Sequence, residues 1–169
     1  MRYAGKDVTG ISARDAARAV VCLIPEGRGI FPNLTVRENL WMMTFTGKSR
    51  EEIETDAYQR FPILAQRAKQ TAGTMSGGEQ QMLALSRGLA CDPAVLLLDE
   101  LSMGLAPLIV EQLYGQVAEL ARTGVAVLVV EQFATAVLDM ADRAAVLVRG
   151  KVVYDGPPGT RTAARSAMS

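Results

Sequence analysis

Apolar residues in the second half of the chain alternate between short unbroken runs and helically spaced positions. An unbroken apolar run of strand length is typical of a strand buried on both faces. The predicted order is strand, helix, strand, helix, strand, at residues 94–98, 107–122, 125–130, 134–141 and 144–148. A glycine turn at 150–151 then predicts a hairpin into 152–154. This alternation predicts a parallel sheet covered by helices.

The middle of the chain departs from this pattern and predicts several helices in succession. Two capping boxes, Thr35 with Glu38 and Ser76 with Glu79, begin predicted helices that run to about 45 and about 90. A charged helix at 49–60 and a helical segment at 62–69 lie between them, and residues 16–24 change from helical to strand character. We therefore expect core strands at 1–34, a helical subdomain at 35–90, further core at 91–156 and a flexible tail at 157–169.

Composition narrows the classes of protein that fit. The chain has 169 residues, enough for one domain with a real core, and a mean hydropathy of +0.14. Its 18 basic and 18 acidic residues give no net field that would favour nucleic acid or anionic lipid. The apolar runs are far shorter than the ~20 residues that span a bilayer. Cys22 and Cys91 are most simply reduced core residues, and the absence of histidine excludes histidine bases and zinc sites.

The turn Ser76-Gly77-Gly78-Glu79 is a candidate phosphate site. The start of a helix offers unpaired amides and partial positive charge, and both favour phosphate. Gly77 and Gly78 carry no side chains that would keep a phosphate from their backbone, and the Ser76 hydroxyl could add a hydrogen bond. A simple capped helix start explains this turn equally well.

The strand at 94–98 ends in the acidic pair Asp99 and Glu100. The carboxyl edge of a parallel sheet is where such sheets bind ligands. Asp99 could hold a Mg²⁺-bound water, and Glu100 could polarise the water that attacks a γ-phosphate. Taken alone, the pair is better explained as solvated acids after a buried strand. Ser76 and Asp99 are 23 positions apart, which fits one helix, a loop and a strand, and this spacing favours the site.

Together these segments resemble the ABC ATPase family. Residues 75–80 (M-S-G-G-E-Q) resemble its signature, and 95–100 resemble its Walker B strand. Further likeness lies in the Q-loop region at 24–40, the D-loop E-L-S-M-G-L-A-P and the switch segment V-V-E-Q-F-A. The likeness is strongest to LivF-type ATP-binding subunits of branched-chain amino acid importers, over about residues 5–156; urea and other amide importers look similar. It implies an α/β fold, a partial ABC-ATPase core with a mostly parallel sheet plus a helical subdomain.

The resemblance implies a role for each matching position. Ser76, Gly77, Gly78 and Glu79 would clamp the γ-phosphate of ATP held by the opposite subunit. Asp99 would act on Mg²⁺ through a water, and Glu100 would be the catalytic carboxylate. Glu26 stands where most of the superfamily has the Q-loop glutamine.

Two further positions depart from the usual pattern. Gln132 stands where most members have the switch histidine, so a hydrogen bond is kept and any proton transfer is lost. The D-loop residues are Gly104, Leu105 and Ala106, and Ala106 replaces the usual aspartate. LivF-type proteins share most of these departures.

One family motif is missing. No G-x-x-x-x-G-K-[ST] loop occurs, so the Walker A β-α unit and the adenine-stacking aromatic residue are expected to be absent. We expect a truncated subunit or an incomplete fragment that does not hydrolyse ATP alone.

The implied partners are a second ABC ATPase subunit, two membrane permease subunits and, indirectly, a periplasmic or extracellular substrate-binding protein. The expected place is the cytoplasm, on the inner face of the cell membrane. No nucleic acid is expected: a DNA-repair or chromosome-organising ABC ATPase would need long heptad segments between the motifs. The alternative function is a non-catalytic module that donates its signature to a complete ABC subunit. Trp41, Met42, Met43 and Phe45 could form core or line a groove for a permease coupling helix, and both readings stay open.

Overall fold

The computed structural model describes residues 2–3, 6–7, 9–10, 12, 21–27, 29–132 and 135–158. These residues belong to two compact units, one up to Glu131 and one from Gln132. The predicted helical stretch before residue 21 and the predicted tail beyond 158 lie outside the described residues. No helix within the described ranges is long and apolar enough to cross a membrane.

The first unit is built around a three-stranded parallel sheet in the order β3-β4-β5. The strands are β3 (Val21–Ile24), β4 (Val95–Asp99) and β5 (Ala126–Val130). Ile24 pairs with Leu98, and Leu98 pairs with Val129, so the three strands end at nearly the same level. The predicted parallel sheet is confirmed for these strands. A separate two-residue ribbon pairs β1 (Arg2–Tyr3) with β2 (Lys6–Asp7).

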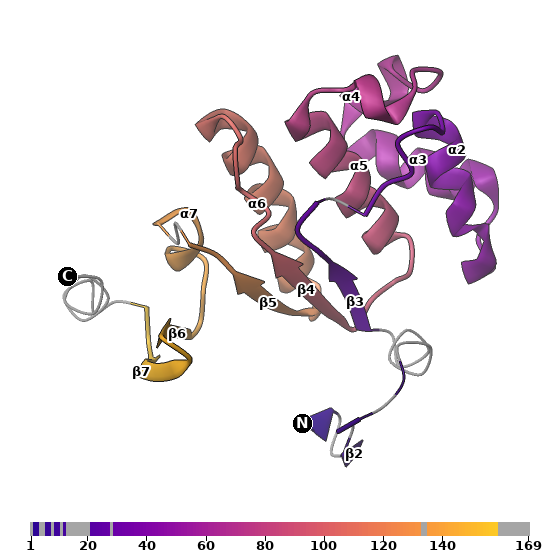
Figure 1. The fold of residues 1–169 in the computed structure, drawn as a ribbon. Helices are drawn as coiled ribbons and strands as arrows, with labels where there is room; N and C mark the ends of the chain where they lie inside the picture. The colour runs from indigo at the N-terminus through magenta and orange to yellow at the C-terminus, as the bar shows by residue number, and fades with distance from the viewer. Residues whose placement is uncertain are drawn as a thin grey trace. The chain divides into compact units, whose positions relative to one another are not determined.

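Two helices cover one face of this sheet, α5 (Gly77–Leu89) and α6 (Pro107–Arg122) (Figure 1). Both connections step in the same direction along the sheet, and the right-handed crossover that parallel strands strongly prefer then places both helices on the same side. Leu96 and Leu98 are fully buried beneath them. Gly88 lets α5 approach β3, since an added Cβ would lie 3.1 Å from both Cys22 and Ile24. Burial also raises the pKa of the Cys22 thiol to about 11.

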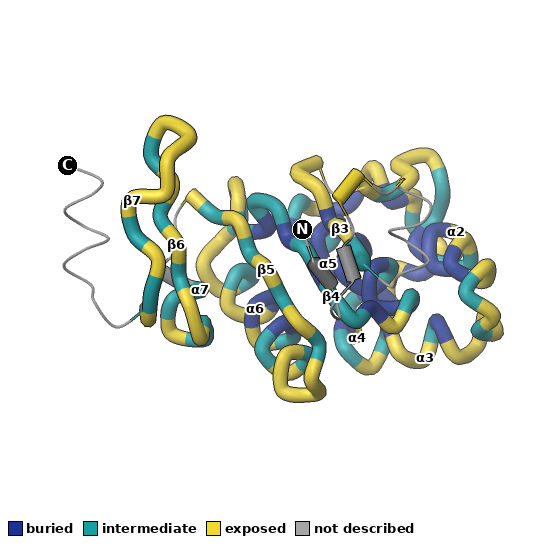
Figure 2. Tube along the Cα trace, turned by 90° about the horizontal axis from the view of Figure 1, so that it is seen from below, coloured by how far each residue is buried: buried dark blue, intermediate teal, exposed yellow. Residues whose placement is uncertain are grey.

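The opposite face of the sheet is exposed. Leu23, Leu128 and Val130 have 57%, 58% and 54% of their surface accessible, and Leu23 and Leu128 belong to one row through Leu97. Figure 2 looks at the strands from below, with α6 behind them and β5 alternating between exposed and half-buried residues. Parallel sheets are normally covered on both faces. The predicted cover of helices is therefore present on one face only of the sheet that the structure describes.

The helical subdomain packs α2 (Val36–Trp41), α3 (Arg50–Arg60) and α4 (Pro62–Gln66) against α5. Two 3₁₀ turns, η1 (Met42–Thr46) and η2 (Ala72–Thr74), connect these helices. Its core is made of leucine and isoleucine side chains: Leu40, Ile53, Leu64, Leu83 and Leu85. Both predicted capping boxes are confirmed, and Ser49 with Glu52 forms a third at the start of α3. The first predicted helix is shorter than expected, because it tightens into η1 and ends at Gly47 in the left-handed region (φ 93°).

The cluster of Trp41, Met42, Met43 and Phe45 was open to two interpretations, subdomain core or a groove for a partner helix. The structure shows that its members differ in burial. Met43 is buried in the subdomain core, and Trp41 is half-buried, donating to Glu54 at 2.6 Å. Met42 and Phe45 point to solvent, with 49% and 77% of their surface exposed. Only these last two are available to a partner.

The second unit contains α7 (Thr135–Leu138) and an antiparallel hairpin of β6 (Ala144–Val148) and β7 (Lys151–Gly156). The predicted hairpin is confirmed. That residues 144–148 also add a strand to the parallel sheet stays a prediction. Arg149 and Gly150, which join β6 to β7, both have positive φ (49° and 75°), as in the two-residue turns that join neighbouring antiparallel strands. Of the predicted helix at 134–141, α7 covers 135–138, and Ala134 lies outside the described residues.

A buried amide joins the loop after β3 to the helical subdomain. Asn39 is fully buried; its Oδ1 accepts from the Phe31 amide at 2.8 Å. Its Nδ2 donates to the carbonyls of Phe31, Leu34 and Thr35 at 2.9, 3.3 and 3.0 Å. One side chain thus satisfies four backbone groups.

We expect Asn39→Ala to lower the free energy of unfolding by roughly 1–3 kcal/mol, because it removes four hydrogen bonds and leaves the Phe31 amide without its acceptor. Urea unfolding followed by circular dichroism measures this. The control is Asn33→Ala in the same loop, where the side chain is exposed and little change is expected. Equal effects of the two substitutions would contradict the assigned role.

Candidate functional site

The signature turn, Ser76 to Glu79, starts helix α5 with a complete capping box. The Ser76 hydroxyl accepts from the Glu79 amide at 3.3 Å, and the Glu79 carboxylate accepts from the Ser76 amide at 2.9 Å. Ser76 is exposed and Gly77 is half-buried. The first amides of a helix have no partner within the helix, so this exposed start has donors and partial positive charge to offer an anion.

Glu79 is held by two groups. Besides the Ser76 amide, its carboxylate pairs with Arg67 at 2.6 Å, and Arg67 also donates to Gln70 at 3.0 Å. Burial acts to raise the pKa of Glu79, but the hydrogen bonds from Ser76 and Arg67 outweigh it and hold that pKa below its usual value. Glu79 therefore remains a carboxylate that fixes the turn.

Gly78 is glycine for a packing reason. A Cβ built on it would lie 2.6 Å from Cγ2 of Ile109 in the first turn of α6, which is closer than side chains approach. The signature turn therefore packs directly against α6, the helix that follows the acidic pair. The sequence suggested a bare surface for phosphate at this glycine, and the structure shows a helix contact there.

The acidic pair stands at the carboxyl edge of the central strand. Asp99 is the last residue of β4 and Glu100 follows it, both half-buried. Glu100 has a left-handed backbone (φ 48°), which costs a residue other than glycine about 1–3 kcal/mol and requires support from its surroundings. Part of that support is a hydrogen bond from the Glu100 amide to the Val130 carbonyl at 2.9 Å.

The segment after Glu100 turns the chain into α6. Leu101 is buried, the Leu105 amide donates to the Ser102 carbonyl at 3.2 Å, and Gly104 has a φ of 71°. Ala106 is the N-cap of α6 and provides no side-chain hydrogen bond. The predicted D-loop residues Gly104, Leu105 and Ala106 are thus consecutive members of one turn, with Gly104 and Ala106 exposed and Leu105 half-buried.

Glu131 is a residue of this region that the sequence did not single out. Its carboxylate accepts from the amide and the hydroxyl of Ser102, at 2.9 and 2.8 Å, and from the hydroxyl of Tyr114. It therefore ties the end of β5 to the turn after the acidic pair and to α6. In the sequence, the segment V-V-E-Q pointed to Gln132 through the family resemblance. No motif or spacing marked the neighbouring Glu131 as a site residue.

Glu26 lies at the sheet edge that carries Asp99 and Glu100, because β3 and β4 end together. It is exposed, in the loop after β3. Arg87 of α5 fixes that loop by donating to the Gly29 carbonyl and stacking over Phe31, with its guanidinium carbon 4.7 Å from the ring centre. Gln132, the first residue of the second unit, is exposed.

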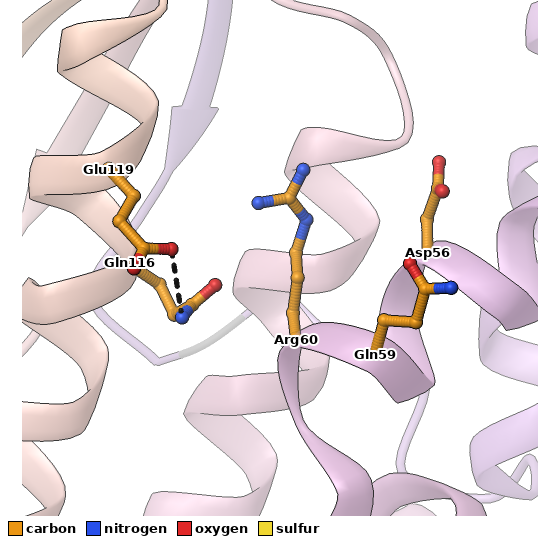
Figure 3. A pocket seen from close by; sticks show the side chains of 5 residues that line it. All are labelled: Asp56, Gln59, Arg60, Gln116 and Glu119. Carbon is orange, nitrogen blue, oxygen red and sulfur yellow. Dashed lines mark hydrogen bonds between the residues drawn. The ribbon is translucent and has the colours of Figure 1, made fainter.

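A polar hollow of about 260 Å³ lies elsewhere, between α3 and α6. Figure 3 shows its lining side chains, which include none of the predicted site residues: Asp56, Gln59, Arg60, Gln116 and Glu119. Within the described ranges, no three acidic, cysteine or histidine side chains gather to hold a metal ion.

Residues 1–102 match the sequence model of the ABC transporter family. The chain belongs to this family. Over 155 residues it is 46% identical to the high-affinity branched-chain amino acid transport ATP-binding protein BraG of Pseudomonas aeruginosa. Over 156 residues it is 33% identical to the probable branched-chain amino acid transport ATP-binding protein LivF of Archaeoglobus fulgidus. Each match covers 90% of this chain and 66% of the relative.

These findings confirm the predicted LivF-type resemblance. Among solved structures, the ABC ATP-binding cassette MJ0796 bound to ADP and Pi matches with a TM-score of 0.80 at 18% identity. That match covers 92% of this ABC chain and 72% of the other. At this identity the likeness shows the fold alone, and it confirms the predicted α/β cassette. The ABC chain spans about two thirds of the length of its two curated relatives.

In this ABC subunit we expect Gly78→Ala to lower the free energy of unfolding by roughly 1–3 kcal/mol, because the new methyl group overlaps Ile109. In an Ile109→Ala background the same substitution should cost little, and urea unfolding of the four variants gives the coupling. Gly115→Ala is the matched control, since an added Cβ there meets nothing within 4 Å. A cost that does not depend on the residue at 109 would contradict the packing role.

Proposed function

We propose that this chain forms part of the ATP-hydrolysing subunit of an ABC importer for branched-chain or related amino acids. The observation that carries the proposal is its 46% identity to BraG over 90% of the chain. The exposed signature turn and the carboxylates at the sheet edge supply the chemistry that such a subunit needs.

The signature turn would bind the γ-phosphate of an ATP held by a second subunit. The Ser76 hydroxyl and the amides of Gly77 and Gly78 would donate to phosphate oxygens, helped by the partial positive charge of α5. Glu79 would act within this clamp by fixing the turn through the Ser76 amide and Arg67.

The acidic pair suits a Mg²⁺-nucleotide. Carboxylate oxygens are ligands that Mg²⁺ prefers, and the ion is usually held by one or two of them together with substrate phosphates. Asp99 would hold the ion through a water, and the bound ion would neutralise phosphate charge. Glu100 would orient the attacking water and accept its proton. Glu26 would reach the same water and sense the membrane subunit, and Gln132 would donate a hydrogen bond to the γ-phosphate without transferring a proton.

The proposed assembly contains two ATPase subunits beneath two membrane permease subunits, which receive substrate from an external binding protein. The chain would work in the cytoplasm at the inner face of the membrane. Closure of the two subunits on ATP would drive the conformational change of the permeases. Met42 and Phe45 are the exposed apolar side chains that would receive a permease coupling helix.

A second candidate function is a non-catalytic module that donates its signature to a complete ABC subunit. The observation that favours it is the signature turn itself, which is exposed at Ser76 and held by a complete capping box. In this case Ser76 would matter to the partner's turnover and Glu100 would not.

We expect the 169-residue chain alone to release no phosphate from ATP. Measurable turnover that is lost on Glu100→Gln would falsify this expectation. With a complete ABC partner subunit present, phosphate release should fall strongly for Ser76→Arg under both functions. Because the acidic pair would act on ATP bound by its own subunit, Glu100→Gln is compared in a subunit that also carries a G-x-x-x-x-G-K-[ST] loop. A comparable fall there favours the catalytic subunit, and an unchanged rate favours the signature donor. Glu111→Gln, an exposed substitution on α6, is the control.

We expect the double substitution Met42→Ser with Phe45→Ser to abolish co-purification with the permease subunits while the fold is kept, because both side chains are exposed. Pull-down with tagged permease, with circular dichroism as a check of folding, measures this. Leu147→Ser, equally apolar and 66% exposed on β6, is the control. Retained co-purification of the double variant would remove these residues from the interface.

A further inference from the structure

The carboxylate of Glu131 is the meeting point of three segments of the first unit. It follows β5, and it accepts from Ser102 in the turn after β4 and from Tyr114 in the middle of α6. Ser102 contributes both its amide and its hydroxyl, at 2.9 and 2.8 Å. Glu131 and Ser102 are half-buried, and Tyr114 is buried with 4% of its surface exposed.

The neighbouring backbone continues this connection. The Glu100 amide donates to the Val130 carbonyl at 2.9 Å, so two consecutive residues at the end of β5 hold two positions of the turn. Leu101, between those positions, is buried with 1% of its surface exposed. The turn is therefore held by hydrogen bonds at the residues before and after the buried Leu101. Glu100 requires this support because its backbone is left-handed, with a φ of 48°.

The chemistry of the three contacts suits a carboxylate. An ionised carboxylate only accepts hydrogen bonds, and each of its three partners donates one. A glutamine could keep two of these bonds through its oxygen and reverse the third by donating its NH₂ to the Ser102 hydroxyl, whereas a methionine of similar length offers none of these partners a strong acceptor. Burial, together with the hydrogen bond to Glu131, raises the pKa of Tyr114, which keeps its phenol a donor.

We propose that Glu131 is a positioning residue that holds the turn 100–102 in the conformation that directs Glu100 toward the nucleotide. The function of Glu100 rests on the proposed ATPase role, whereas the structural part of the inference does not. Glu131 would act through Ser102 and the backbone of Glu100, without touching the nucleotide.

Hydrogen exchange measured by NMR on the full chain without nucleotide tests the structural part. In Glu131→Met we expect the amides of Ser102 and Glu100 to exchange at least about tenfold faster, while β4 amides such as Leu97 change little. Ser102→Ala should reproduce part of this effect, and Ser102→Thr, which keeps the hydroxyl and the amide, should not. Glu111→Gln is the control for loss of one negative charge.

A uniform rise in exchange over β4, β5 and the turn would overturn the inference, since Glu131 would then only stabilise the fold. Unchanged exchange at Ser102 and Glu100 would overturn it as well. Should Glu131→Met fail to fold, Ser102→Ala and Tyr114→Phe each remove one hydrogen bond and are judged by the same amides.

A kinetic measurement separates this inference from the proposed function. In the assembled transporter, Glu131→Met should lower kcat for ATP about tenfold or more and leave KM nearly unchanged, because misdirection of Glu100 affects the chemical step. An equal change in KM and kcat would contradict positioning. Full turnover after Glu100→Gln would instead overturn the catalytic role of Glu100 and leave the exchange result standing.

Discussion

The parallel pairing of β4 with a strand on each side is the constraint on which the rest of the first unit depends. Parallel strands in register bring their carboxyl ends to one edge, so residues far apart in the sequence become neighbours there. Glu26, Glu100 and Glu131 each follow one of the three strands. The same pairing directs both crossovers to one side, which gives α5 and α6 a common face and leaves the other face open.

The residues of the signature turn have structural duties as well as the proposed chemical ones. Glu79 closes the capping box and pairs with Arg67, and Gly78 makes room for Ile109. The fold and the proposed phosphate ligand therefore both require these residue types in the turn. The capped-helix reading and the phosphate reading therefore describe one turn and are compatible.

The sequence was sufficient wherever local forces decide the structure. The bounds of α6 and β6 agree with the predicted ones, because a first-turn proline and a two-residue turn mark them locally. Tertiary packing decides that Met42 is exposed while Met43 is buried, and it also decides the contacts of Glu131. The spacing of apolar residues along the sequence does not specify such packing. Among the site residues, the family likeness found those with a motif, and Glu131 has none.

The contact between Gly78 and Ile109 has a mechanical consequence. With no side chain at position 78, no compressible layer separates the start of α5 from the first turn of α6, and packed protein interiors transmit strain. The start of α5 therefore packs directly against the first turn of α6. Tyr114 lies five residues after Ile109 in α6, about one and a half turns, and through Glu131 it is connected to the turn that carries Glu100. Packing and hydrogen bonds thus form one continuous series of contacts from the signature turn to the turn of the acidic pair.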